Sequence, residues 1–450
     1  MVTPRPDVLP PITVVDLFSG CGGFTQGFHE FRPAAGDGEG PVFHSIAAVE
    51  HNVAAAATYA VNFGTLRPDE RVPAARVHVG DIEDWQPTPQ ARHADVVVGG
   101  PPCQGFSALN RNKKGSERNR LWEEYVRIVA DIRPKVFVIE NVDRFLKSDE
   151  FRNLLNEVKE GGKLSEYRLV DPPGYDPSCS DEEKNKRYLL NAADYGAAQA
   201  RRRAIVIGVR RDIDNGRTLM YPPRTHVRRP RGSLAATVQP LDGLDAGMSY
   251  WQAVDDIFSE SARRDIRGTE LPDGKEFIPE VNSVLQGIFT THDLHFGRNP
   301  EPLSRARYRA IPRGGNRKDL RDKWYTLDEF NEVHIFETPN PPGVRTTVEP
   351  LSTKSWDNHN TGTGDVMGRL RYGEPSVTIR TEFFKPEKGR YLHPEEPRPI
   401  THYEAARIQG FPLGFRWCGS KIEIATQIGN AVPIPLGKAI AASIHAYLRG

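Results

Sequence analysis

A cysteine enclosed by turn-forming residues is the first candidate for chemistry in this sequence. Cys103 lies within Gly99–Ser107 (GGPPCQGFS), directly after the apolar run 95–98. A lone cysteine is most often a buried structural residue. Here, two prolines precede the cysteine, and polar and basic residues follow it. Because α/β sheets bind ligands beyond the carboxyl ends of their strands, this placement favours a nucleophilic thiol.

Charged residues at the ends of two further apolar runs are candidates for the same pocket. Glu140, followed by Asn141, ends the run 135–142. Such a carboxylate is either paired structurally or functional, and a neighbouring strand end would bring it near Cys103. Gln199, Arg201 and Arg203 open the last run and share one face of a strand, whereas Arg202 points away. This cluster is either a solvated edge or a set of guanidinium groups able to hold a base carbonyl or a phosphate.

A glycine-rich turn is a candidate nucleotide site. Asp16–Gly23 (DLFSGCGG) joins the first apolar run to an amphipathic stretch, 23–31. Glycines in such a turn let backbone N–H groups approach a ligand, although some turns of this kind are only structural. Glu50 ends the second run, where a carboxylate can accept from ribose hydroxyls. Asp81 follows a short possible strand, 76–79, and could accept from an adenine amino group.

The elements that must position these residues form an alternating pattern over 12–212, which predicts a doubly wound α/β domain. Continuous Val/Ile runs are typical of strands covered on both faces, as in a parallel sheet. The amphipathic stretch 121–132 predicts a helix that Arg133-Pro134 ends. The apolar runs are Ile12–Phe18, Ser45–Glu50, Ala94–Gly100, Lys135–Val142 and Arg203–Val209.

The pattern changes in the rest of the chain. Residues 215–365 have little periodicity and much Gly, Pro and Arg, which predicts a second, irregular domain. Periodicity returns within 366–450, where Pro435 opens a helix. One face of that helix carries Leu436, Ile440, Ile444 and either Tyr447 or Leu448.

Composition excludes several classes of protein. The chain has 450 residues, a net charge of +1 and four cysteines. It is long enough for two or three domains. The cysteines form neither a disulfide framework nor the paired spacing of a zinc site, so no metal is expected. No apolar run approaches the ~20 residues of a membrane span, and Met1–Pro11 lacks an apolar signal core. We therefore expect a cytoplasmic protein.

Taken in order, the motifs resemble those of the DNA cytosine-5 methyltransferases. DLFSGCGGF, VE, GD, GGPPCQGFS, ENV, QxRxR and GNAVP follow one another from residue 12 to the last helix. Each motif is short, but their order is highly specific. Only the middle of the chain contains none of these motifs. The resemblance implies a Rossmann-like methyltransferase domain that uses S-adenosylmethionine (SAM), with a smaller target-recognition domain at 215–365. It also implies that 366–450 returns to the catalytic domain.

The resemblance assigns roles to the candidate residues. The Cys103 thiolate would attack carbon 6 of a cytosine flipped out of duplex DNA, so that carbon 5 can take the methyl group of SAM. Glu140 would act at N3 of the base, and Arg203 and Arg201 would hold its carbonyl. The implied cofactor contacts are Phe18, Gly20, Gly22, Glu50, Asp81, Ile82, Pro101, Asn430 and Val432.

Two basic segments are candidates for contacts with DNA. Residues 110–120 hold five basic residues against one acid, and 298–323 hold nine against three. Solvated charged surfaces are the alternative in both cases. The resemblance implies that the first loop closes over the flipped base and that the second segment contacts phosphates. The expected contacts are Ser107, Lys113, Lys114, Arg118, Arg313, Gly314, Asn316 and Arg317.

The sequence departs from the family pattern at three places, none in the expected chemistry. Tyr403 stands where Arg is usual, Ala197-Ala198 precedes Gln199 where Pro is common, and Ile434 separates two prolines. Three alternatives are a tRNA cytosine methyltransferase, a regulatory protein with an inactive methyltransferase fold, and an NAD-dependent oxidoreductase. The long middle region argues against the first, Cys103 and Glu140 against the second, and the glycine spacing against the third.

The resemblance is strongest to bacterial restriction–modification enzymes without an additional regulatory domain. It implies double-stranded DNA as the partner and a cognate restriction endonuclease encoded nearby. We expect a monomer in the cytoplasm of a prokaryote, associated with the nucleoid.

Overall fold

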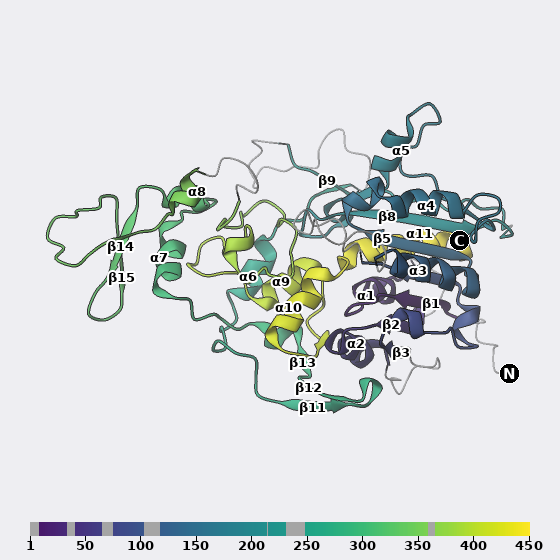
Figure 1. Cartoon of the computed structure of the whole chain (residues 1–450), viewed down its shortest axis with the longest axis horizontal. Coiled ribbons are helices and arrows are strands. Elements are labelled where there is room, and N and C mark those ends of the chain that lie inside the picture. Colours follow the sequence, from purple (N-terminus) through teal and green to yellow (C-terminus); the bar gives the residue numbers. More distant parts are fainter. Residues whose placement is uncertain are drawn as a thin grey trace, which may run out of the picture.

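A central sheet of eight strands organises the first half of the chain (Figure 1). The computed structural model describes residues 9–33, 41–64, 75–102, 118–213, 215–230, 248–358 and 365–450. The strand order is β3-β2-β1-β4-β5-β8-β6, and β7 also pairs with β8. The strands are β1 (Ile12–Leu17), β2 (Phe43–Glu50), β3 (Arg76–Val79), β4 (Val96–Gly99), β5 (Val136–Asn141), β6 (Tyr167–Leu169), β7 (Leu189–Asn191) and β8 (Arg202–Arg210).

The predicted α/β class is confirmed, and each apolar run forms a strand of this sheet. Strands β1 to β5 are parallel. The last run differs from the expected parallel arrangement, because β8 is antiparallel to β5, β6 and β7. A strand covered on both faces is continuously apolar whichever way it runs, so the sequence could not show its direction.

Helices cover this sheet, and the chain's last helix lies beside its first. Helix α1 (Gly23–Glu30) packs against α11 (Ile434–Arg449). The approach is close, since a Cβ atom on Gly27 would lie 2.7 Å from the backbone nitrogen of Lys438. The predicted helix at 121–132 is α3 (Arg118–Ile132). Helices α2 (Val53–Tyr59), α4 (Asp149–Glu157) and α5 (Asp181–Arg187) complete this half.

The predicted face of the C-terminal helix is the buried one. Leu436, Ile440, Ile444 and Tyr447 are all buried, and the helix begins one residue before Pro435. These side chains join the same core as the sheet, which includes Val15 and Val98. The last helix of the chain therefore packs against the sheet.

A second hydrophobic core lies beside the sheet and draws on distant segments. Val254 and Phe258 pack there with Tyr403 and Ile424. The core thus crosses the predicted boundary at 365/366, and the domain limits remain a prediction. Its main elements are α6 (Asp255–Ser261), β13 (Phe289–Thr290), α9 (His402–Gln409), β17 (Arg416–Trp417) and α10 (Lys421–Asn430).

The remaining elements are short, and those of residues 302–358 lie farthest from the large sheet (Figure 1). A small core containing Tyr308, Leu320 and Leu351 holds the outermost part together. None of the helices formed by the described residues is long and apolar enough to cross a membrane. These elements are β9 (His226–Val227), β10 (Ser249–Tyr250), β11 (Lys275–Ile278), β12 (Ser283–Gln286), α7 (Pro302–Ala310), β14 (Trp324–Leu327), β15 (Val333–Phe336), β16 (Glu349–Pro350) and α8 (Lys354–Asn358).

Candidate active site

A cavity of about 850 Å³ opens at the carboxyl ends of β1, β2, β4 and β5. Its volume is in the range of small-molecule and cofactor sites. The sheet supplies one side, including the glycine-rich turn, Glu50, Pro101 and Glu140. The other side comes from residues 378–381 and from α10 and the turn that follows it. Segments from both ends of the chain therefore build one site.

The glycine-rich turn has the backbone that a cofactor cradle requires. Gly20 (φ 55°) and Gly22 (φ 89°) adopt left-handed conformations, which glycine takes without steric penalty. A Cβ on Gly20 would meet nothing within 4 Å, and Gly20 lines the cavity. A Cβ on Gly22 would collide with the ring of Phe63. Gly20 therefore leaves room for a ligand, whereas Gly22 lets the turn pack against the protein.

Glu50 is held rigidly where β2 ends. Its Oε2 accepts from the backbone N–H of Gly20 at 2.9 Å, and its Oε1 accepts from that of Asn52 at 2.8 Å. His51 Nδ1 lies 3.1 Å from Oε1, and this hydrogen bond raises the pKa of His51. The carboxylate thus ties the glycine-rich turn to the start of α2, with its oxygens at the cavity wall.

Six of the nine expected cofactor residues line the cavity: Phe18, Gly20, Glu50, Pro101, Asn430 and Val432. Gly22, Asp81 and Ile82 do not. The Asp81 carboxylate accepts from the N–H of Glu83 at 3.0 Å and begins a short 3₁₀ turn. Ile82 is buried in the core of the sheet. In this structure Asp81 and Ile82 therefore support the fold and do not line the cavity.

Asp16 is a cavity residue to which our sequence analysis gave no role. Its Oδ2 accepts from the Thr25 hydroxyl at 2.7 Å, and Thr25 in turn lies 2.9 Å from the hydroxyl of Tyr59. Burial raises the pKa of Asp16 to about 7. A carboxylate within the apolar run ITVVDLF was the available signal.

Glu140 and Arg203 face each other from the neighbouring strands β5 and β8. Arg203 Nε lies 2.8 Å from Glu140 Oε1, and both side chains are largely shielded and line the cavity. Asn141, the next residue, donates from Nδ2 to the carbonyl of Pro101 at 2.9 Å. The end of β5 thereby fixes the backbone that leads to residue 103. Pro102 also lines the cavity. Cys103, Ser107, Lys113 and Lys114 lie outside the described residues, as does the side chain of Arg118.

Arg201 also lines the cavity, but its side chain is buried and hydrogen-bonded within the protein. Its side chain is 2% exposed, and burial lowers its pKa to about 9. Nη1 donates to the carbonyl of Ile379 at 2.8 Å, and Nη2 donates to that of Gly429 at 2.9 Å. The contact between Arg201 and the base stays a prediction. Both hydrogen bonds that its fork makes join the sheet to the opposite wall of the cavity.

The wall formed by Thr378, Ile379, Arg380 and Thr381 was missed by sequence reasoning. The N–H of Ile379 donates to Gln199 Oε1 at 2.7 Å, and Tyr391 donates its hydroxyl to the carbonyl of Thr378 at 2.9 Å. The segment follows an irregular stretch without periodicity, so the sequence held no signal for its place. Long-range hydrogen bonds fix it beside β8.

The site geometry agrees with the comparisons to known proteins. A family model described as C-5 cytosine-specific DNA methylase matches residues 12–446. The chain belongs to this family. The motif order had indicated the same family.

Relatives occur in animals and in bacteria. The chain is 28% identical to mouse DNA (cytosine-5)-methyltransferase 1, over 98% of this chain and 28% of that protein. It is 28% identical to the type II methyltransferase M1.HphI of Haemophilus parahaemolyticus, over 96% of this chain and 86% of the relative. It is also similar in fold to an E. coli crystal structure described as a DNA modification methyltransferase encoded within a prophage. That match has a TM-score of 0.56 and 21% identity, and covers 98% of this chain and 100% of the other.

The basic segment 298–323 of this family member is largely engaged within the protein. Eight of its nine Lys and Arg side chains donate to a backbone carbonyl or form an ion pair; Lys318 has no such partner among the described residues. In a region with little regular structure, many backbone carbonyls lack the N–H partners that helices and sheets provide. Guanidinium groups donate hydrogen bonds to these carbonyls. The same charges were the basis for predicting phosphate contacts.

The expected DNA contacts in this segment have structural partners. Arg317 is 4% exposed and donates from Nη1 to the carbonyl of Trp356 at 2.7 Å, which is incompatible with the predicted phosphate contact. The Gly314 carbonyl accepts from Arg390 at 3.1 Å, and the Asn316 side chain accepts from the N–H of Lys318. Arg313 is exposed and pairs with Glu395 at 2.6 Å.

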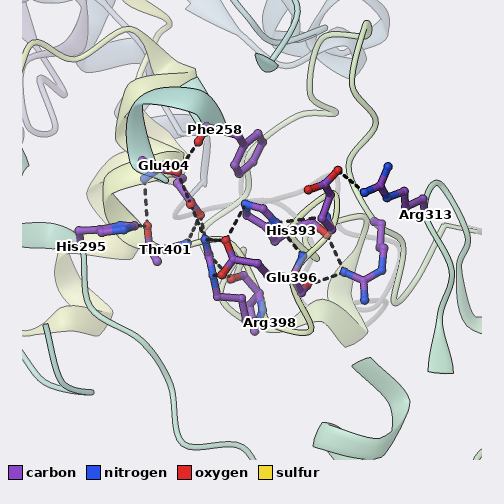
Figure 2. Close-up of polar contacts among 12 residues, drawn as sticks. Phe258, His295, Arg313, His393, Glu396, Arg398, Thr401 and Glu404 are labelled. Atoms are coloured by element: carbon purple, nitrogen blue, oxygen red, sulfur yellow. Dashed lines mark hydrogen bonds and ion pairs between the residues drawn. The ribbon is translucent and has the colours of Figure 1, made fainter. Parts of the chain in front are cut away.

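A polar cluster explains how α9 is fixed although Tyr403 stands in place of the usual Arg (Figure 2). Arg398 donates to both oxygens of the fully buried Glu404, at 2.8 and 2.9 Å. Burial would raise the pKa of Glu404, but the Arg398 charge outweighs it and holds the pKa at about 2. Ser261 of α6 also donates to Glu404, at 2.9 Å. Glu404 therefore ties α9 to α6 and to the segment that precedes α9.

Proposed function

We propose that this protein transfers a methyl group from SAM to carbon 5 of a cytosine flipped out of duplex DNA. The observation that carries the proposal is one cavity that joins a glycine-rich cradle to the Glu140–Arg203 pair and to the strand end before Cys103. Cofactor and base must meet in such a space. Because a stacked base cannot reach a pocket of this kind, the base must leave the duplex.

The described residues fit SAM. Gly20 leaves open space in the cradle, and the Glu50 carboxylate is anchored at the wall where a ribose would be bound. Phe18, Asn430 and Val432 complete the lining on either side. When bound, SAM supplies an electrophilic methyl group. The chain's own contribution is to bind and orient the reactants and to exclude water.

Each protein group has a defined task at the base. The Cys103 thiolate would add to carbon 6, which gives carbon 5 the electron density to accept a methyl group. Glu140 would hold N3 with a hydrogen bond or proton while charge develops on the ring. Arg203 would orient the base carbonyl from the same wall. Loss of the carbon-5 proton and elimination of the thiolate would then restore both the aromatic ring and Cys103.

The biological setting follows from the bacterial relatives. M1.HphI and the other bacterial relatives are named type II methyltransferases. We propose a corresponding restriction–modification role here, with a cognate endonuclease, double-stranded DNA as substrate and a prokaryotic cytoplasm as location. Residues 12–212 and 366–450 would form the catalytic part and 215–365 the target-recognition part of a monomer.

Bisulfite sequencing tests the proposal. Unmethylated genomic DNA is incubated with SAM and the purified protein, with a Cys103→Ser variant as control. We expect protection of cytosines in one short sequence by the wild type and none by the variant. Protection that survives in the variant would remove Cys103 from the mechanism. Absence of protection in both would exclude DNA as the substrate and make tRNA the next one to test.

A further inference from the structure

Arg380 differs from every other Asp, Glu, His or Arg side chain that lines the cavity. Eight such residues line it, and seven have a hydrogen-bond or ion-pair partner within the protein. For Arg380, the described residues provide no side-chain partner, and the side chain is exposed. The partnered residues are Asp16, Glu50, His51, Glu140, Arg201, Arg203 and Glu423.

The backbone on either side of Arg380 is rigidly held. Ile379 is fixed through both its N–H and its carbonyl, to Gln199 at 2.7 Å and to Arg201 at 2.8 Å. On the other side, a Cβ on Gly429 would collide with the backbone of Thr381, so α10 packs directly on the wall. A cation on such a wall is already positioned, and less conformational entropy is lost when it binds an anion.

We propose that Arg380 binds a backbone phosphate of the DNA strand beside the flipped cytosine and so positions that strand at the cavity mouth. The inference rests on the proposed function, because DNA is the polyanion that this reaction brings to the cavity. A guanidinium fork matches two phosphate oxygens. The alternative oxyanion is the carboxylate of the cofactor. The exposure of Arg380 favours the phosphate, since the cofactor cradle is lined by buried residues such as Glu50 and Val432.

The salt dependence of DNA binding tests this proposal. Fluorescence anisotropy would be measured on a duplex that carries the methylated sequence, from 50 to about 300 mM salt. We expect Arg380→Ala to make the slope of log K against log salt less negative by about 0.9, with affinity roughly tenfold weaker near 0.1 M salt. Arg380→Lys should keep most of the slope. Arg152→Ala removes an exposed arginine of α4 that does not line the cavity, and it should match the wild type.

Calorimetric titration with SAM shows whether Arg380 binds a DNA phosphate or the carboxylate of the cofactor. An unchanged Kd for SAM in Arg380→Ala, together with the reduced slope, supports the phosphate contact. A weakened Kd for SAM with an unchanged slope would overturn it and assign Arg380 to the cofactor carboxylate. An unchanged slope and an unchanged Kd would also overturn it. Failure of the proposed function would be seen in the wild type itself, as absence of cytosine protection, and would remove this inference with it.

Discussion

Arg203 and Glu140 form an ion pair across the antiparallel strands β8 and β5, with Nε and Oε1 2.8 Å apart. Both side chains are mostly shielded from water, and both line the cavity. Their charges balance each other in the free protein. In the proposed reaction, a cytosine would share the two groups, and either group without the other would be an uncompensated charge at the base.

The first prediction concerns this pair. Glu140→Gln should lower kcat by roughly 10²–10⁴-fold, the range of a lost acid–base group, while DNA affinity changes little. Arg203→Ala should also lower kcat, and the double variant should lose less than the two single effects combined, because each change disrupts the same unit. Single-turnover methylation measures all three.

A matched control for the pair is Glu166→Gln. Glu166 pairs with Arg133 at 2.8 Å, but both side chains are more than half exposed and neither lines the cavity. This variant should keep the wild-type rate. Additive losses from Glu140→Gln and Arg203→Ala would show that the two residues act independently, contrary to the geometry.

Arg201 should behave as a positioning residue. Arg201→Met leaves the carbonyls of Ile379 and Gly429 without their donor, so we expect the free energy of unfolding to fall by about 2–4 kcal/mol. Urea denaturation monitored by circular dichroism measures the loss. SAM should bind more weakly as well, since Gly429 directly precedes Asn430 at the cavity. A fall in kcat with unchanged stability would instead support a direct contact between Arg201 and the base.

The sequence predicted the sheet and the near wall of the cavity well, because both depend on local patterns. Continuous apolar runs mark strands buried on both faces, and Glu50 and Glu140 could be placed because each ends such a run. Strand periodicity also placed Arg201 and Arg203 on one face. It could not show that Arg201 donates to the carbonyl of Ile379, nearly 180 residues later, whereas Arg203 pairs with Glu140.

The same limit applies to the basic segment 298–323, which was predicted to contact phosphates and is largely engaged within the protein. A basic cluster has the same composition whether its charges face DNA or hold loops together. Arg317 and Arg313 are only four residues apart, yet one is buried against Trp356 and the other is exposed. The difference comes from tertiary hydrogen bonds that no local pattern records. Asp16 was missed for a related reason, since its partner Thr25 belongs to the following helix.

Arg317 and Lys318 offer a test within two adjacent residues. Arg317→Ala removes a buried donor to the Trp356 carbonyl, and we expect a loss of about 1.5–3 kcal/mol in stability. Exposed Lys318 has no side-chain partner among the described residues, so Lys318→Ala should leave the melting temperature within about 1 °C. Differential scanning fluorimetry measures both. If Arg317→Ala left stability unchanged and reduced the salt slope of DNA binding, the result would support the predicted contact between Arg317 and a phosphate.

His402 predicts how stability depends on pH. Its ring lies 4.6 Å from that of Phe296 and 5.0 Å from that of Phe383, and its Nε2 donates to the Lys421 carbonyl at 2.8 Å. Burial lowers its pKa from 6.5 to about 4. In the unfolded chain, His402 therefore binds a proton as the pH falls below about 6.5. In the folded protein, His402 stays neutral until the pH approaches about 4. Its contribution to stability is complete above pH 6.5 and is lost as the pH falls toward 4.

His402→Gln keeps an N–H donor for the Lys421 carbonyl and removes the titration. Between pH 7 and pH 5 the wild type should lose about 2 kcal/mol more stability than the variant, as measured by urea unfolding at each pH. The variant should still lose some, because burial also lowers the pKa of His295 and of His393. Equal losses in the two proteins would mean that His402 accepts its proton without unfolding, and that the aromatic cluster opens to water in acid.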